Sequence, residues 1–276
     1  MQQEEINQDS GLTVRQPELS FGPEIARYWF CDNPTITHNF NGYNLMFPTF
    51  ERFFIRSVLY YKDRITDPQL KAQVAAFVSQ EANHARAHED YFALLEQQGY
   101  PVRRHLKRFD RYTGTIERLA SPKLRIAMTA AAEHYTATLA NIILHTPSLV
   151  ERMAPEMQKL IVWHAVEEME HRSVAFNVMR QAEVGYLVRI LAFLMVTLDS
   201  LLWVNLGSFL FLRTDRISLF RSLRYKLRFR REFPAVSGLF RRSLLAYFRR
   251  GYHPDQMQTP EAYHSQLDNV GIHATS

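Results

Sequence analysis

Glu81-Ala82-Asn83-His84 and Glu168-Met169-Glu170-His171 each place a carboxylate and an imidazole three residues apart. Three residues are just under one helical turn, so both side chains of each pair project from the same face of a helix. Two further acids, Glu51 and Glu133, lie in apolar segments of helical character. A glutamate on each of two helices and a Glu-x-x-His on each of two others form the ligand set of a di-iron or di-manganese site inside a four-helix bundle.

The two acid and imidazole stripes extend beyond these pairs. His88 lies one turn after His84, and His164 lies one turn before Glu168. At about 100° per residue, the members of each stripe fall within a narrow arc. His164 is therefore a candidate third histidine ligand, whereas His88 is either an extra ligand or a residue that orients one. Glu170 points well away from the stripe, so we expect it to be exposed.

A charged side chain on an apolar helix face is unfavourable unless it is paired or bound to a metal ion. The alternatives to a metal site are a buried carboxylate–histidine hydrogen-bond network and a placement of these groups on the surface. Carboxylate-rich ligation with imidazole favours iron or manganese. We therefore expect two metal ions, with iron as the first choice and manganese or zinc as alternatives.

Four helices are expected to form the bundle. Two of them begin with a capping residue followed by proline, at Asp67-Pro68 and at Ser121-Pro122. A stretch of about twenty residues joins the second helix to the third, which is the long crossover of ferritin-like bundles. The sequence thus predicts an all-α protein: a ferritin-like four-helix bundle with additional C-terminal apolar and basic helices. The expected bundle helices span residues 48–64, 68–98, 122–146 and 155–185.

Composition divides the chain of 276 residues into four segments. Residues 1–46 are expected to form an irregular leader, 47–185 the di-metal bundle, 186–250 the apolar and basic helices, and 251–276 a disordered tail. The single cysteine, Cys31, excludes an internal disulfide and cysteine-based zinc or iron–sulfur sites. The first residues have neither the basic nor the apolar region of a secretory signal, so we expect a cytoplasmic protein.

The C-terminal third combines apolar and basic character. Residues 190–212 are apolar and long enough to span a membrane, but Asp199 and Asn205 argue against a span. Residues 213–250 hold twelve Arg or Lys residues against two acids, although the net charge of the whole chain is only +5. We expect this part to lie against the bundle or on the inner face of an anionic membrane, as in a peripheral protein. The alternatives are a solvated basic face over ordinary core positions and, less favoured, nucleic-acid binding.

Residues 80–88 (QEANHARAH) and 163–171 (WHAVEEMEH) resemble a mainly bacterial family described as predicted metal-dependent hydrolases, over roughly residues 30–250. The spacing of His164, Glu168 and His171 is also similar to that in the three-histidine, four-glutamate site of the di-iron p-aminobenzoate N-oxygenases. His88 and the C-terminal third depart from that pattern. The second resemblance implies seven metal ligands: Glu51, Glu81, His84, Glu133, His164, Glu168 and His171.

The leading hypothesis for the function is a di-iron oxidoreductase that uses O₂ to oxidise a small, apolar substrate with electrons from an unknown donor. A metal-dependent hydrolase, in which two metal ions activate a water molecule, is the first alternative. A non-enzymatic, membrane-docked metal-binding protein is the second. The sequence leaves open whether the chain forms a homodimer.

Overall fold

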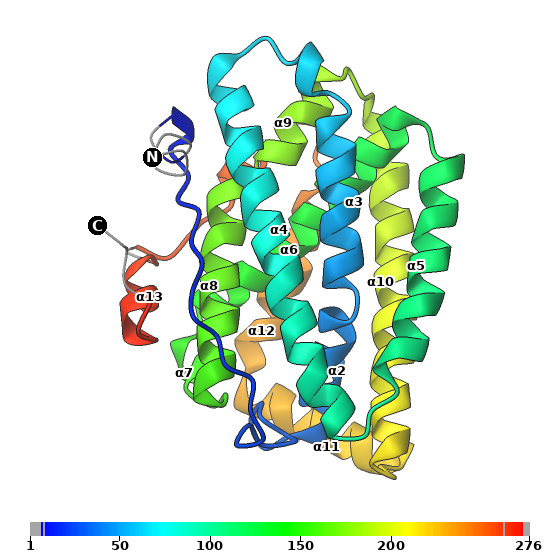
Figure 1. Ribbon diagram of the computed structural model, residues 1–276, viewed down its shortest axis with the longest axis vertical. Coiled ribbons are helices and arrows are strands. Elements are labelled where there is room, and N and C mark those ends of the chain that lie inside the picture. Colours follow the sequence, from blue (N-terminus) through cyan, green and yellow to red (C-terminus); the bar gives the residue numbers. More distant parts are fainter. Residues whose placement is uncertain (1–6, 8, 262, 273–276) are drawn as a thin grey trace.

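The computed structural model describes residues 7, 9–261 and 263–272, and within them the regular structure is helical. An isolated antiparallel bridge pairs Phe30 with Met153, and no β-strand forms in the described residues. The prediction of an all-α protein is therefore confirmed. Long helices lie side by side, and shorter ones close the two ends of the molecule (Figure 1).

Four helices carry the acid and imidazole stripes: α3 (Phe47–Leu59), α4 (Pro68–Gln97), α6 (Pro122–Leu144) and α8 (Pro155–His171). The helix α3 packs along α4, and α6 packs along α8; α3 also contacts α6, and α4 contacts α8 (Figure 1). Asp67 accepts a hydrogen bond from the first turn of α4, and Ser121 does the same for α6. Both predicted helix starts are confirmed, and proline follows each cap because its missing N–H is not needed there.

The other elements surround these four helices. The connection between α4 and α6 is itself helical, as α5, and lies along the outside of the bundle (Figure 1). The bounds are α2 (Pro34–Asn44), α5 (Val102–Leu119), α7 (Pro147–Val150), α9 (Val174–Gln181), α10 (Tyr186–Thr214), α11 (Leu219–Glu232), α12 (Pro234–Ala246) and α13 (Ser265–Asn269), with short 3₁₀ helices η1 (Lys62–Arg64) and η2 (Pro254–Gln256).

Two segments differ from the sequence prediction. The fourth helix was expected to be continuous over 155–185, but α8 ends at His171 and α9 begins at Val174. At the break, the Arg172 guanidinium donates a hydrogen bond to the Met169 carbonyl. The tail after residue 250 was expected to be disordered, yet its described part includes η2 and α13, and Leu267 is buried in the core.

The apolar segment 190–212 lies within α10, which is long and apolar enough to cross a membrane by length and composition. One face of α10 is nevertheless buried against α2 and α6. At the crossing with α2, a Cβ atom added to Gly42 would lie only 2.6 Å from the Val204 carbonyl oxygen. On another side, the hydroxyl of Tyr112 in α5 donates a hydrogen bond to Asp199. These contacts make α10 a packed member of the fold.

We expect Gly42→Ala to lower the free energy of unfolding by about 1–3 kcal/mol, because the added methyl group has no room beside the Val204 carbonyl. Gly114→Ala in α5 is the matched control, since nothing lies within 4 Å of its added Cβ atom. The higher helix propensity of alanine should there raise stability by roughly 0.5–1 kcal/mol. Urea denaturation followed by circular dichroism measures both changes. Unchanged stability in Gly42→Ala would mean that the α2–α10 crossing is loose in solution.

Candidate metal centre

The eight side chains predicted to bind or orient metal ions meet in the interior of α3, α4, α6 and α8, and none of them is more than 7% exposed. The spacings of three and four residues place each set on one helix face. Aromatic rings pack edge-on against two of the imidazoles, Phe77 against His171 and Trp163 against His84. The eight are Glu51 on α3, Glu81, His84 and His88 on α4, Glu133 on α6, and His164, Glu168 and His171 on α8.

His171 is the meeting point of three carboxylates. Its Nε2 atom lies 3.1 Å from an oxygen of Glu81, 3.3 Å from one of Glu133 and 3.5 Å from one of Glu168. Its other ring nitrogen, Nδ1, lies 3.0 Å from the side-chain oxygen of Gln80. Because an amide oxygen only accepts, Nδ1–H donates to Gln80, and Nε2 is the ring nitrogen that faces the carboxylates.

In His84 the two ring nitrogens have the opposite roles to those in His171. Its Nε2–H donates to Glu167 at 2.9 Å, which leaves the lone pair of Nδ1 directed inward. That Nδ1 atom lies 3.8 Å from Glu81 and 3.7 Å from Glu168. Both Glu-x-x-His histidines therefore direct one ring nitrogen at the carboxylates, and it is through such a nitrogen, once unprotonated, that imidazole binds a metal ion.

His164 and His88 form a linked pair. The Nε2 atom of His164 lies 2.8 Å from Glu168 and 3.9 Å from Glu51. Its Nδ1 atom lies 2.8 Å from Nε2 of His88, whereas the distance from His88 to Glu51 is 4.0 Å. His88 thus contacts the ring of His164 more closely than it contacts a carboxylate, as expected of a residue that fixes the orientation of a ligand.

The cluster concentrates negative charge where water cannot reach it. Burial, reinforced by neighbouring carboxylates, raises the pKa of Glu51 and of Glu81 well above the usual range, and raises the pKa of Glu133 to about 7. Burial also acts to lower the pKa of His171, but Glu168 and Glu133 outweigh it and hold that pKa well above its ordinary value. A bound cation reverses this balance and allows the carboxylates to stay ionised.

The hydrogen bonding of these groups tests whether they fit a metal ion. Buried polar atoms in proteins almost always have partners. In this cluster, however, most atoms that face inward make no hydrogen bond. Carboxylate oxygens and imidazole nitrogens are the donors that divalent iron, manganese and zinc accept, so the residues fit a metal ion. The atoms of the eight residues without partners are both oxygens of Glu51, Glu81 and Glu133, Oε2 of Glu168, Nδ1 of His84 and of His88, and Nε2 of His171.

The donors fall into two groups that share members. At one end of the cluster, Glu51 lies with His88 and His164 and also with Glu81 and His84; at the other end, Glu81 and Glu168 lie with His171, which Glu133 also contacts. Glu168 connects them, because its Oε1 atom faces His84 and His164 while its Oε2 atom faces His171. Glu81 also faces both groups.

Residues outside the two motifs support the centre, and one of them, Arg15, was not predicted from the sequence. The backbone N–H of Arg15 donates to Glu167 at 2.8 Å, and its guanidinium lies 2.8 Å from Glu170. Burial raises the pKa of Glu167 to about 8, and Arg15 acts against that rise. Arg15 therefore favours the ionised form of Glu167, which can accept a hydrogen bond from Nε2–H of His84. Glu170 was expected to be exposed, but only 7% of its side chain is, because Arg15, Gln80 and His264 surround it.

A small cavity of about 50 Å³ reaches the cluster. His88, His164 and Glu168 form its inner end. The remaining wall is apolar except for one threonine, and consists of Phe40, Phe47, Thr136, Leu139, Ala140, Ile143, Ile161 and Ala165. The cavity therefore places an apolar wall next to His88, His164 and Glu168.

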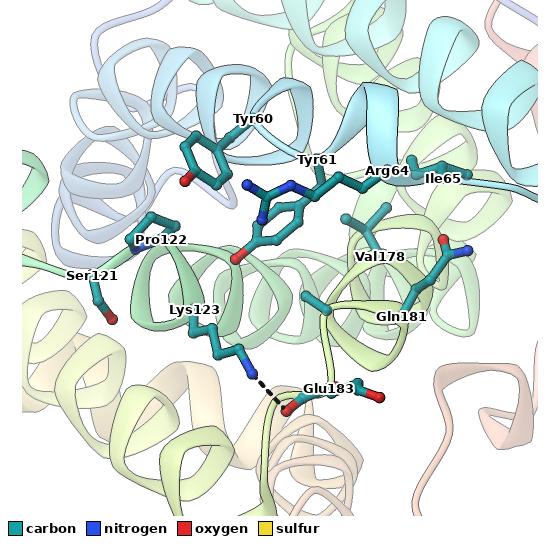
Figure 2. A pocket seen from close by; sticks show the side chains of 11 residues that line it. Tyr60, Tyr61, Arg64, Ile65, Ser121, Pro122, Lys123, Val178, Gln181 and Glu183 are labelled. Atoms are coloured by element: carbon teal, nitrogen blue, oxygen red, sulfur yellow. Dashed lines mark hydrogen bonds between the residues drawn. The ribbon is translucent and has the colours of Figure 1, made fainter.

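A larger hollow of about 480 Å³ lies elsewhere, between the end of α3, the start of α6 and α9 (Figure 2). Tyr60, Tyr61 and Arg64 line one side, and Lys123 donates a hydrogen bond to the Glu183 carbonyl on the other. None of the eight predicted site residues lines this hollow. Of the two spaces, the smaller cavity is the one that contacts the buried cluster.

Glu167 offers a direct test of how the centre is organised. We expect Glu167→Ala to weaken Mn²⁺ or Fe²⁺ binding by about 10–100-fold, because His84 loses the acceptor that fixes its proton on Nε2. Glu167→Gln keeps an oxygen acceptor and should retain most of the affinity. Glu156→Ala, on the first turn of the same helix, is the control. Competition with a chromophoric chelator measures the dissociation constants. Equal affinity in Glu167→Ala and wild type would contradict the assignment.

Comparison with known proteins agrees with this geometry. The family model for predicted metal-dependent hydrolases matches residues 13–258, a span that includes α3, α4, α6 and α8 as well as Arg15. No curated protein and no solved structure gave a significant match. The match covers most of the chain and all eight residues of the buried cluster. The chain therefore belongs to the family of predicted metal-dependent hydrolases.

Proposed function

We propose that this protein is a two-metal enzyme built on a ferritin-like bundle, and that it uses O₂ to oxidise a small, apolar substrate. One observation carries the proposal: buried carboxylate oxygens and imidazole nitrogens converge without hydrogen-bond partners. Such a cluster is unfavourable unless cations neutralise it. The family description supports the dependence on metal, and the composition of the cavity supports the choice of reaction.

The order of the ligands along the chain supports the ferritin-like assignment. The helices α3 and α6 each contribute one glutamate, while α4 and α8 each contribute a Glu-x-x-His pair. The connection that includes α5 separates the second and third of these helices, as a long crossover does in ferritin-like folds. Sequence and arrangement therefore agree with the di-metal carboxylate pattern on each of the four helices.

The two groups of donors suggest how the ions would be held. Glu51, His84 and His164 would hold one ion, Glu133 and His171 the other, and Glu81 and Glu168 would serve both. A pair of iron ions, when bound, supplies the redox chemistry needed to activate O₂. Four glutamates offer enough negative charge to balance two divalent cations, which agrees with a pair rather than a single ion.

The protein around the ions would control what reaches them. Phe47 packs against the rings of both His88 and His164, at centroid distances of 4.8 and 5.3 Å. Together with Phe40 and Ile161 it gives the cavity an apolar wall that disfavours water. His88 keeps the ring of His164 in place through their contact at 2.8 Å. These residues would position a small apolar substrate beside the centre, and an external donor would supply the electrons.

The hydrolase named by the family description is the second candidate. In that reaction the two metal ions would activate a water molecule for attack on a polar bond. The substrate of a hydrolase usually needs polar groups that bind the developing charge or the leaving group. Away from the cluster, Thr136 is the one polar side chain among the residues that line the cavity. For this reason we favour oxidation of an apolar substrate.

Oxygen uptake tests the leading proposal. Metal-free protein reconstituted anaerobically with Fe²⁺ should consume O₂ when mixed with aerated buffer, at roughly one O₂ per two iron ions. Glu168→Ala should abolish iron binding and uptake, because Glu168 faces both groups of donors. Glu89→Ala is the matched control, since Glu89 lies on α4 but is 44% exposed and pairs with Arg52. An oxygen electrode and elemental analysis measure both quantities.

The same preparations separate the alternatives. Hydrolysis of ester or phosphoester substrates by the Mn²⁺ or Zn²⁺ form without O₂ would establish the second candidate and exclude the first. Many irons per chain without turnover would instead indicate metal storage. Wild-type levels of iron in Glu168→Ala would contradict the two-metal centre itself.

Stability after metal removal provides a separate test. In chelator-stripped protein, Glu51→Gln should raise the free energy of unfolding, because burial disfavours the ionised carboxyl at this position. Since the pKa of Glu51 is raised in the folded state, its contribution to stability falls as pH rises above about 4.5, and the advantage of the variant should widen up to neutral pH. In metal-loaded protein the variant should instead hold less iron and be less stable. Urea denaturation of both forms across this pH range makes the comparison. A variant that destabilises the stripped protein would contradict this account.

A further inference from the structure

We propose that the face formed by α10 and α11 docks the protein on an anionic lipid bilayer, with α10 remaining packed on the bundle. The protein would then be a peripheral membrane protein held by apolar and basic side chains together. This inference is independent of the reaction at the metal centre. It is built on exposed apolar residues, on the hydrogen bonding of polar residues in α10 and on the placement of charge.

Exposed apolar side chains are concentrated in one part of the chain. Within the described residues, all large apolar side chains that are exposed lie between residues 187 and 248, with three exceptions: Leu59, Tyr60 and Leu119. On α10 they recur every three or four residues, so they form one stripe along the helix. Exposure reaches 80% at Leu187. The stripe consists of Leu187, Val188, Leu191, Leu194, Leu198, Leu201, Leu202 and Phe209, and α11 adds Leu219, Phe220, Leu223 and Leu227.

Polar residues of α10 do not interrupt this apolar character. The side chain of Asn205, which is exposed, donates a hydrogen bond to the carbonyl of Leu201. Thr197 donates a hydrogen bond to the Phe193 carbonyl at 2.7 Å, and Thr214 donates one to the Leu210 carbonyl at 3.0 Å. Hydrogen bonds within the helix satisfy polar groups without water, as is needed at the edge of a lipid phase. The outer face of α10 thus suits contact with acyl chains.

The inner face of α10 excludes a simple membrane span. Arg189 is 6% exposed, and its guanidinium donates to the carbonyls of Tyr247 and Arg249. Asp199 accepts a hydrogen bond from Tyr112 of α5. Gly42 contacts the backbone at Val204 so closely that no side chain fits between the two helices. Insertion of α10 across a bilayer would break all of these contacts, so the helix can contact lipid only along its outer stripe.

Positive charge is concentrated on α11, among the exposed apolar side chains of that helix. All six basic residues of α11 are exposed, and none of their side chains forms an ion pair within the described part of the chain. Several of them line an open hollow of about 850 Å³ with Tyr225 and Leu227. Free guanidinium groups next to exposed leucines match a surface of anionic headgroups over an apolar interior. The six are Arg221, Arg224, Lys226, Arg228, Arg230 and Arg231.

Two other partners could bind to this surface, nucleic acid and a second copy of this chain, but each matches it less well than a bilayer does. Nucleic acid would neutralise the arginines but leave the stripe of α10 in water, because phosphate backbones provide no apolar surface. A second copy of this chain could cover the leucines, but its own α11 carries the same positive charge and cannot neutralise these arginines. A bilayer with anionic lipids satisfies both the apolar and the charged residues.

Flotation of the full chain with vesicles tests the proposal. We expect the protein to float with vesicles made of equal parts phosphatidylcholine and phosphatidylglycerol, and to bind pure phosphatidylcholine vesicles much more weakly. High salt should release the protein in part, because screening weakens the attraction to the headgroups. When the protein is expressed in cells, alkaline carbonate should release it from membranes, as a peripheral protein requires.

Two variants separate the apolar and the charged contributions. Leu198→Gln with Leu201→Gln should weaken vesicle binding by roughly tenfold or more; Leu119→Gln on α5, at a position that is 82% exposed, is the control for the same kind of change. A triple change of Arg224, Arg228 and Arg231 to Gln should weaken binding by about a hundredfold. Its control removes the same charge from Lys62, Lys71 and Arg86, which are exposed on other elements.

Each result of these experiments either supports or overturns docking on an anionic bilayer. Selective loss of binding in the two α10 and α11 variants supports the proposal. Absence of flotation with anionic vesicles overturns it, as does equal loss in the controls or retention of the protein in membranes after carbonate. If wild type is a dimer by analytical ultracentrifugation, and only the leucine variant is monomeric without an effect on flotation, the stripe is a contact between copies. Tighter binding to DNA than to vesicles at matched salt would favour nucleic acid.

Discussion

Four buried glutamates that point at one another are the constraint on which the rest of this structure depends. Glu51, Glu81, Glu133 and Glu168 come from four different helices, and almost all of their oxygens lack hydrogen-bond partners. Without a cation, these carboxyl groups stay buried by keeping their protons, which is why the pKa values of Glu51, Glu81 and Glu133 are raised. A bound cation would displace those protons and hold the ionised carboxylates together, so metal ions and protons would compete for this cluster.

The parts of the centre that could be predicted from sequence are those that depend on local geometry. Helical periodicity alone places Glu81 beside His84 and Glu168 beside His171, and the structure keeps both relations. The contact between Arg15 and Glu167 joins residues 152 positions apart, and no periodic pattern encodes such a distance. The break after His171 escaped prediction for another reason. The residue types around it, without glycine or proline between His171 and Val174, are compatible with a continuous helix.

Hydropathy could not assign α10, because its two faces have different environments. The average over the helix meets the requirements of a membrane span. Only the packing shows that Val204 and Phe211 face the bundle while Leu198 faces outward. The sequence contains a hint in Gly207, which lies near Gly42 and, like it, permits a close approach of the two helices. A small residue in an apolar segment is, however, as common in membrane helices as in packed ones.

One helix joins the metal centre to the surface helices. On α6, Glu133 faces the centre, while the next residue, His134, contacts the Ser243 carbonyl of α12 at 3.0 Å. The residue after that, Tyr135, reaches Thr197 of α10 at 2.6 Å. Glu133, His134 and Tyr135, which lie about 100° apart around the helix, therefore contact the ligand cluster, α12 and α10 in turn. Since all three contacts share a single turn of α6, a shift of α10 or α12 against the bundle would displace Glu133 as well.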